Sequence, residues 1–283
     1  MAAEANASRF PAPRRLVVNA DDFGLNSATN QAVIRAHREG ILTSTSLMVN
    51  EPGFQEAVEL AREHPRLGVG LHLTLIWGHS SLSQNQIPGL VNASGEFSYN
   101  PALTGLRLFF RRALKSQLRA EIHAQFQKFQ STGLPLDHVN GHLHLHLHPA
   151  IFRILAEDAA ALGIRRLRLT RDPFRLNLRA ASGRLVYRVV HAAIFGLLSR
   201  RARPVLDRLG IRYTRHVFGL LQNALVDTPY VKALLPLLPP GDSELYSHPS
   251  LDDFKNELEA LIDPQVRQQV DRLGIQLIRY QDL

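Results

Sequence analysis

The chain has 283 residues, of which 45% are hydrophobic and 20% charged, as in an ordinary soluble globular protein. It contains no cysteine, which excludes disulfides, thiolate metal sites and a cysteine nucleophile. Any metal must therefore be held by His, Asp or Glu, and 13 histidines are present. No apolar run reaches the ~18 residues of a membrane span, and the start of the chain lacks the apolar core of a secretory signal. We therefore expect a cytoplasmic protein.

The net charge of +8 is concentrated in one region. Between Arg165 and Arg215 there are 14 arginines and no lysine, with Asp172 and Asp207 as the only acids. That stretch carries a charge of +12, so the rest of the chain sums to −4. The function of the protein should account for this local excess of positive charge.

Strand-like and helix-like runs alternate from residue 15 onward. We predict strands over Arg15–Asn19, Leu42–Val49, Gly68–His72, Leu136–Asn140, Arg166–Thr170, Glu244–Ser247 and Ile275–Arg279. We predict helices over 28–39 (capped by Ser27), 54–63, 114–130, 150–162 and 184–209. This alternation favours a parallel sheet with crossover helices, because parallel strands need long connections. The predicted fold class is α/β, a (β/α) barrel-like fold similar to a distorted TIM barrel of seven or eight strands.

The predicted barrel has two additions. Residues 1–14 are rich in alanine and contain two prolines, so we expect a disordered N-terminal tail. Residues 15–283 are expected to form a single domain, interrupted by an Arg-rich helical insertion over about 171–240.

Side chains able to bind a metal or transfer a proton follow several of these strands. The first strand is followed by Asp21 and Asp22, the third ends in His72, the fourth precedes His142, and the late strand precedes His248. In open α/β sheets and in barrels, chemistry collects at the carboxyl ends of the strands. Scattered histidines would rarely fall in this way, so the pattern predicts one shared site.

Two adjacent acids in the segment 18–24 are the sharpest local signal. Directly after a buried strand, Asp21 and Asp22 can point in different directions, so one can bind a cation while the other takes a proton. Gly24 would allow a turn with positive φ. The alternative is a helix N-cap or an Asx-turn, in which these acids have only a structural role.

The histidines allow two interpretations. A lone His72 on an apolar strand is often only a hydrogen-bonded core residue. In an extended chain His142, His144, His146 and His148 would lie on one side, about 6.6 Å apart, which is too wide for all four to bind one ion. His142 is the best candidate ligand, and His144 could lie behind it or touch substrate. For His146 and His148 one interpretation is that they are simply solvated, and the sequence assigns them no role.

Four motifs together resemble the YdjC family of carbohydrate deacetylases. They are Asn-Ala-Asp-Asp-Phe-Gly at 19–24, Gly-Leu-His-Leu at 70–73, Asp-His-Val-Asn-Gly-His-Leu-His at 137–144 and Tyr-Ser-His-Pro at 246–249. They occur in order along most of the chain. The resemblance implies a (β/α)-barrel-like fold, one divalent metal ion and hydrolysis of the acetamido group of an amino sugar.

Roles for individual residues follow from the same resemblance. It implies that Asp22, His72 and His142 bind the metal (Mg²⁺, Zn²⁺ or another first-row divalent ion), with Asp21 as general base and His248 as general acid. Asn19, His144 and Arg168 are expected around the substrate or behind the ligands. One carboxylate and two imidazoles leave coordination positions for a water and the amide carbonyl. The bound ion would activate that water, and an acid must protonate the leaving amine.

The basic insertion has several interpretations. Its helix over 184–209 could be an exposed lid with a solvated basic face, or a lid that docks on anionic lipid. Nucleic-acid binding is not expected, because no binding motif or interleaved aromatics accompany the arginines. The Asn-Gly-His-Leu-His motif and the insertion resemble the hopanoid-biosynthesis branch of the family.

That branch implies an N-acetylglucosaminyl bacteriohopanepolyol as substrate, and a protein that contacts the inner face of the membrane peripherally. A soluble chitooligosaccharide is the alternative substrate. An alternative of another class is a basic membrane- or nucleic-acid-binding module whose histidines only sequester metal.

Overall fold

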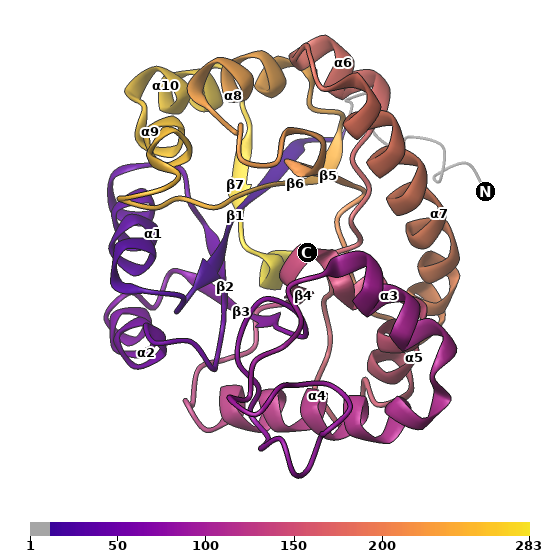
Figure 1. Cartoon of the computed structure of the whole chain (residues 1–283). Helices are drawn as coiled ribbons and strands as arrows, with labels where there is room; N and C mark the ends of the chain where they lie inside the picture. Colours follow the sequence, from indigo (N-terminus) through magenta and orange to yellow (C-terminus); the bar gives the residue numbers. More distant parts are fainter. Residues whose placement is uncertain (1–11) are drawn as a thin grey trace, which may run out of the picture.

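Seven parallel strands form one sheet in the computed structural model, which describes residues 12–283 (Figure 1). In chain order they are β1 (Arg14–Phe23), β2 (Ser44–Leu47), β3 (Gly68–Leu73), β4 (Val139–Gly141), β5 (His216–Phe218), β6 (Gly241–Ser247) and β7 (Gln276–Ile278). Their order in the sheet is β4-β3-β2-β1-β6-β5, and β7 pairs with the first part of β1. The predicted α/β class with parallel strands is confirmed.

An irregular stretch over residues 165–171 joins the two edges of this sheet. On one side the Arg168 amide donates to the Val139 carbonyl of β4 at 2.9 Å. On the other side the amide of Val217 in β5 donates to the Arg171 carbonyl at 3.0 Å. The strands therefore close into a distorted barrel. The predicted regular strand over Arg166–Thr170 is wrong, because short β4 and β5 provide too few partners and only isolated bridges form.

Helices surround the strands (Figure 1). They are α1 (Ser27–Glu39), α2 (Phe54–Glu63), α3 (Pro101–Phe110), α4 (Lys115–Gln130), α5 (Pro149–Glu157), α6 (Phe174–Ala180), α7 (Leu185–Leu209), α8 (Thr228–Leu234), α9 (Lys255–Ile262) and α10 (Pro264–Arg272). The cap of α1 is Asn26, whose side chain accepts the Thr29 amide proton, and not Ser27 as predicted. The helix predicted over 150–162 ends at Glu157.

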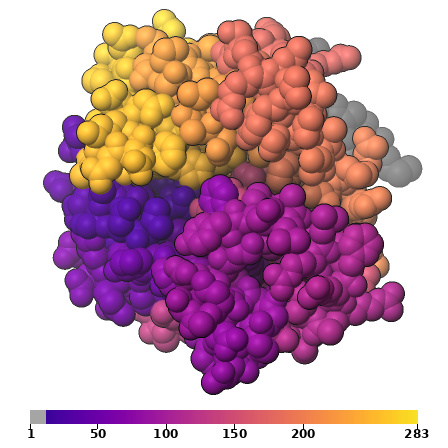
Figure 2. All heavy atoms as spheres, in the orientation of Figure 1, coloured from indigo at the N-terminus to yellow at the C-terminus, as the bar shows by residue number. Residues whose placement is uncertain are grey.

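The core follows from a continuous apolar strand. Residues 16–23 of β1 are all buried, as expected for a parallel strand covered on both faces. By contrast α7 is buried only at Arg188, Ser199, Ala202 and Leu206. On the face drawn in Figure 2, the N-terminal, middle and C-terminal parts of the chain meet at the centre.

Two further expectations concern the ends of the barrel. The predicted disordered tail over 1–14 falls mostly on residues 1–11, which lie outside the described residues, and Arg14 already belongs to β1. The stretch 171–240 contains α6, α7 and α8, and it also supplies β5, a strand that the sequence did not predict. Among residues 12–283, no helix combines the length and the apolar character that crossing a bilayer requires.

Candidate active site

A bulge in β1 turns two adjacent carboxylates apart. The register with β2 runs from Ala20 opposite Thr45 to Phe23 opposite Leu47, so β1 contains one extra residue. Within this bulge Asp22 has a φ of +65°, a strained conformation for a residue with a side chain. Gly24 follows with the positive φ that the sequence predicted, +91°. As a result Asp21 and Asp22 contact different partners.

Asp22 lies within hydrogen-bonding distance of two histidines. Its Oδ1 is 3.1 Å from His72 Nε2 and 3.0 Å from His142 Nδ1, and the two nitrogens are 3.3 Å apart. Ligand atoms around a tetrahedral ion, with bonds of about 2.1 Å, are separated by roughly 3.4 Å. The triangle of ligand atoms therefore fits a single divalent cation. Its three residues come from the carboxyl ends of β1, β3 and β4.

The orientation of the His72 ring is fixed by hydrogen bonds to its Nδ1, the nitrogen that faces away from Asp22. Its Nδ1 lies 2.7 Å from Asn140 Oδ1 and 3.1 Å from Ser46 Oγ. A proton on Nδ1 that is donated to Asn140 leaves the Nε2 lone pair directed at the position between Asp22 and His142. Contacts of this kind orient histidine ligands in known metal sites.

Electrostatics favour a cation at the same point. Burial would raise the pKa of Asp22, but the neighbouring His142 and His72 hold it well below its usual range. Burial would lower the pKa of His142, but Asp22 raises it. In effect, a proton on His142 supplies the positive charge that Asp22 requires. A divalent cation at this point would replace that proton.

Asp21 is fixed by four side chains. Arg168 donates to both of its oxygens, at 2.6 Å to Oδ2 and 2.8 Å to Oδ1. Asn19 (2.8 Å), Ser46 (3.1 Å) and Asn140 (3.1 Å) also donate to Oδ1. Among residues 12–283, Oδ2 has no other donor, so it keeps a lone pair for a further partner. Burial opposes ionisation, but the charge and hydrogen bonds of Arg168, together with the nearby His72 and His248, outweigh it and hold the pKa of Asp21 far below its usual range.

Glu244 is a residue that the sequence reasoning missed. It is fully buried in β6 and accepts two hydrogen bonds from Arg168, at 2.7 and 2.9 Å, and one from the Tyr280 hydroxyl. Arg168 also lies 4.5 Å from the centre of the Tyr246 ring. The signal was available, since an acid in a buried strand that alternates with Tyr246 and His248 shares their face.

His248 follows β6 and is held by Glu257 of α9. The Glu257 carboxylate accepts the backbone amide proton of His248 at 2.6 Å and lies 3.7 Å from its Nδ1. Burial alone would lower the pKa of His248, but Glu257 and the more distant Asp22 and Asp21 raise it to about 9. His248 is therefore protonated at neutral pH and can donate a proton.

The rest of the histidine tract does not stay extended. Residues 142–147 form a 3₁₀ turn with positive φ at Leu143 (+49°) and His144 (+55°), so the predicted even spacing is wrong. His144 is buried, with Nε2 2.8 Å from the Tyr246 hydroxyl. His146 is also buried, with its Nε2 beside the Arg168 carbonyl, and burial is the main reason that its pKa is lowered to about 3. The interpretation of His146 as a solvated side chain is therefore wrong. The half-buried His148 caps α5.

Parallel strands closed into a distorted barrel, with a carboxylate and two histidines at their carboxyl ends, define an α/β barrel protein with a candidate divalent-metal centre. The chain belongs to the family of YdjC-like proteins, whose family model matches residues 15–272.

Relatives of known name agree with this assignment. The chain is 31% identical to a carbohydrate deacetylase of Geobacillus stearothermophilus over 278 residues, which is 95% of this chain and 98% of that one. It is 38% identical to a chitooligosaccharide deacetylase of Proteus mirabilis over 175 residues, 57% of this chain and 62% of that one. The fold matches a solved structure from Enterococcus faecalis V583, a proposed cellobiose-phosphate cleavage protein, with a TM-score of 0.74 at 23% identity, covering 96% and 99% of the chains.

Proposed function

We propose that this chain is a carbohydrate N-deacetylase, a hydrolase that releases acetate from an N-acetylated amino sugar. The observation that carries the proposal is the cluster of Asp22, His72 and His142 beside the separately held Asp21 and His248. The named relatives, carbohydrate and chitooligosaccharide deacetylases, support the same reaction class. Residues 15–283 would act as one deacetylase domain.

Asp22, His72 and His142 would hold one divalent cation. Their donor set suits Zn²⁺ and other first-row ions, or Mg²⁺ with additional waters. When bound, such an ion polarises the acetamide carbonyl and lowers the pKa of a coordinated water. Arg168, Glu244, Asp21 and Asp22 together carry a net charge of −2, which a divalent cation would neutralise.

Asp21 and His248 would move the protons. The water oxygen adds to the acetyl carbon while Asp21 Oδ2, the oxygen with a free lone pair, accepts a water proton. The carbon–nitrogen bond then breaks, and the amine leaves with the proton of His248, so the products are acetate and the free amino sugar. Arg168 keeps Asp21 ionised, and Glu257 keeps His248 charged.

Among substrates, we favour N-acetylglucosamine carried on a hopanoid lipid, with the protein held peripherally at the cytoplasmic face of an anionic membrane. The support is the outer face of α7. Val186, Val190 and Leu197 are exposed on one side of this helix, and Val186 is 79% exposed. Arg200 and Arg201 continue the same side toward the C-terminus. An apolar stripe that runs into arginines suits insertion beside anionic headgroups.

A second helix, α3, also exposes apolar side chains. On α3, Leu103, Leu106, Phe109 and Phe110 are all exposed. Figure 1 places α3, α5 and α7 along one side of the barrel.

A soluble chitooligosaccharide is the second candidate substrate, supported by the name of the Proteus mirabilis relative.

The test uses metal-loaded protein with an N-acetylglucosaminyl hopanoid and, separately, diacetylchitobiose, and measures released acetate. We expect acetate from the glycolipid, together with co-sedimentation of the protein with anionic vesicles. Acetate from the soluble sugar alone, without vesicle binding, would keep the reaction and reject the lipid substrate. No acetate from either, with metal bound, would reject the deacetylase proposal.

A further inference from the structure

Trp77 is a large aromatic side chain at the edge of the candidate site that none of the roles above uses. It is the only tryptophan of the chain, follows β3 by four residues and is 42% exposed. Its ring centroid lies 6.0 Å from that of His142, with the two planes tilted by 56°. A half-exposed indole beside a candidate metal ligand calls for a physical explanation.

The backbone at Trp77 is strained. Its φ is +53°, in the left-handed region that residues with a side chain rarely adopt. Two hydrogen bonds retain this conformation: the Trp77 amide donates to the Ser98 carbonyl at 3.3 Å, and the indole N–H donates to the Tyr99 carbonyl at 2.8 Å. Strain that the surroundings hold in this way tends to occur at functional sites.

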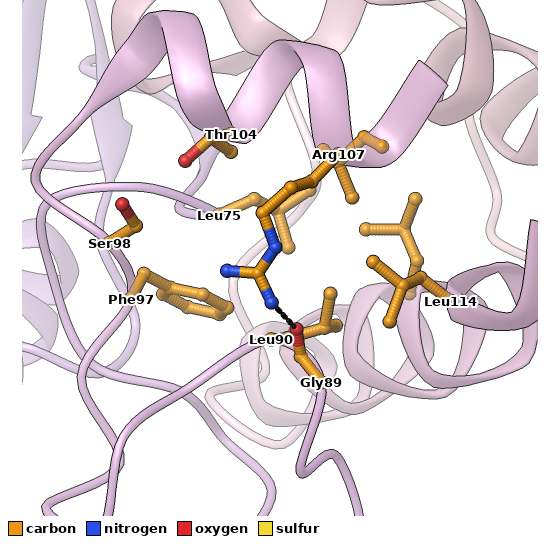
Figure 3. A pocket seen from close by; sticks show the side chains of 10 residues that line it. Leu75, Gly89, Leu90, Phe97, Ser98, Thr104, Arg107 and Leu114 are labelled. Carbon is orange, nitrogen blue, oxygen red and sulfur yellow. Dashed lines mark hydrogen bonds between the residues drawn. The ribbon is translucent and has the colours of Figure 1, made fainter. Parts of the chain in front are cut away.

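The loop that carries Trp77 is closely packed. Phe97 donates its amide proton to the Gly78 carbonyl at 2.9 Å, and a Cβ at Gly78 would come within 2.6 Å of Glu51 Oε1. Figure 3 shows Arg107 of α3 reaching the Gly89 carbonyl, at 2.9 Å, across a small pocket lined by Leu75, Phe97 and Ser98. The cavity is about 20 Å³, room for one water and not for a sugar. These contacts hold the loop that carries Trp77, and the indole itself is 42% exposed, so a ligand can reach its free surface.

We propose that the outer face of Trp77 is a stacking platform for the pyranose ring of the substrate. The inference rests on the proposed function and adds the subsite that orients the sugar. The C–H face of a pyranose is apolar and packs well on a flat aromatic surface. Because the indole N–H is already used by Tyr99, the ring offers its apolar face rather than a hydrogen bond. Stacking there would place an N-acetyl group of the same sugar beside His142.

Intrinsic fluorescence gives a direct test, since every tryptophan signal comes from this side chain. Metal-loaded Asp21→Asn protein is titrated with diacetylchitobiose, and sorbitol, a polyol without a ring, serves as the control ligand. We expect a saturable change of emission with the sugar and none with sorbitol. No change with the sugar up to its solubility limit would overturn the platform.

Kinetics give an independent test. Trp77→Gly suits the positive φ, so its backbone should not oppose folding. We expect its KM for diacetylchitobiose to rise about tenfold, equivalent to ~1.4 kcal/mol, with kcat changed much less, and Trp77→Phe to keep most of the affinity. Turnover of N-methylacetamide, which has no ring, should fall much less in Trp77→Gly than kcat/KM for diacetylchitobiose.

The two proposals can fail separately. If the natural protein releases no acetate but its emission responds to the sugar, the deacetylase proposal fails and the platform stands. If acetate is released while the emission does not respond to the sugar and Trp77→Gly leaves KM unchanged, the platform fails and the deacetylase proposal stands.

Discussion

Two buried aspartates, Asp21 in the barrel centre and Asp172 at the start of the insertion, differ in the direction of their pKa shifts. Burial raises the pKa of both, but at Asp21 the contacts with Arg168 and the nearby His72 and His248 together reverse the effect, and the carboxylate stays ionised. At Asp172 burial wins over two backbone hydrogen bonds and a weak influence of Arg188, and the pKa rises to about 7. Two equally buried carboxyl groups therefore have pKa shifts of opposite direction, and contact with cationic side chains decides the direction.

The two arginines that are buried among residues 12–283, Arg168 and Arg188, show the same contrast. Arg168 gives hydrogen bonds to two carboxylates. Arg188 of α7 donates only to the carbonyls of Ala181 and Gly183, and its Nε and Nη2 have no partner among the described residues. The barrel centre thus has paired charges in a defined geometry, whereas the polar groups below α7 are incompletely satisfied. We expect the first region to carry the chemistry.

The largest expected effect comes from substituting Asp22 and Asp21 one at a time and comparing the two variants. Asp22→Ala should abolish binding of the divalent cation and reduce deacetylation by at least ~10³-fold, because the ion loses its only carboxylate ligand. Asp21→Asn should keep the metal and still lose roughly 10²–10⁴-fold in kcat. Calorimetric titration with Zn²⁺ and an acetate-release assay measure both. Metal binding that survives in Asp22→Ala would show that the ion sits elsewhere and would favour a histidine-rich sequestering module.

Next in size is the stability difference between the two arginines. Arg168→Met leaves Asp21 and Glu244 as buried carboxylates without their cation, and should cost about 3–5 kcal/mol of unfolding free energy. Arg188→Met removes a buried charge that lacks an ion-pair partner, and should be nearly neutral or stabilising. Urea denaturation of the two variants compares them directly. Equal losses would mean that Arg188 has an effective partner and that the contrast is mistaken.

A smaller effect concerns the pH dependence of stability. Because the folded-state pKa of Asp172 is raised to about 7, the unfolded chain ionises this group first as pH rises above the ordinary value of 3.8. The unfolded state then binds fewer protons, so this residue makes stability fall between about pH 4 and 7, by a few kcal/mol. Asp172→Asn should remove that fall. A natural protein and variant with parallel stability–pH curves would contradict the assignment.

The smallest effect is a shift of the alkaline limb of activity. His248 must be protonated to act as the acid, and its pKa is raised to about 9, so kcat should decline as pH rises through 9. The same charge stabilises the fold below the ordinary value of 6.5, and that contribution is lost as pH rises through about 9. Glu257→Gln should move both the decline of kcat and the loss of this stabilisation to lower pH. An alkaline limb that does not move would exclude His248 as the titrating acid.

Part of this molecule was predictable from local patterns. The apolar run of β1, the periodicity of α1, α2 and α4, and the polar residues at the ends of β1 and β3 and directly after β4 and β6 are all local patterns. The structure brings Asp22, His72 and His142 together as the strand-end rule predicts. A helix or strand signal of this kind needs only neighbouring residues, because side chains repeat every 3.6 or 2 positions.

Other features were decided by tertiary contacts alone. The turn at His144, the irregular stretch over 165–171 and the burial of His146 depend on what packs against them. So does the pairing of Arg168 with Asp21, 147 residues apart, and with Glu244. The sequence by itself determined which side chains stand at the strand ends. Only the closed barrel decided which charges neutralise one another, because the cost of burying a charge depends on a partner that can come from anywhere in the chain.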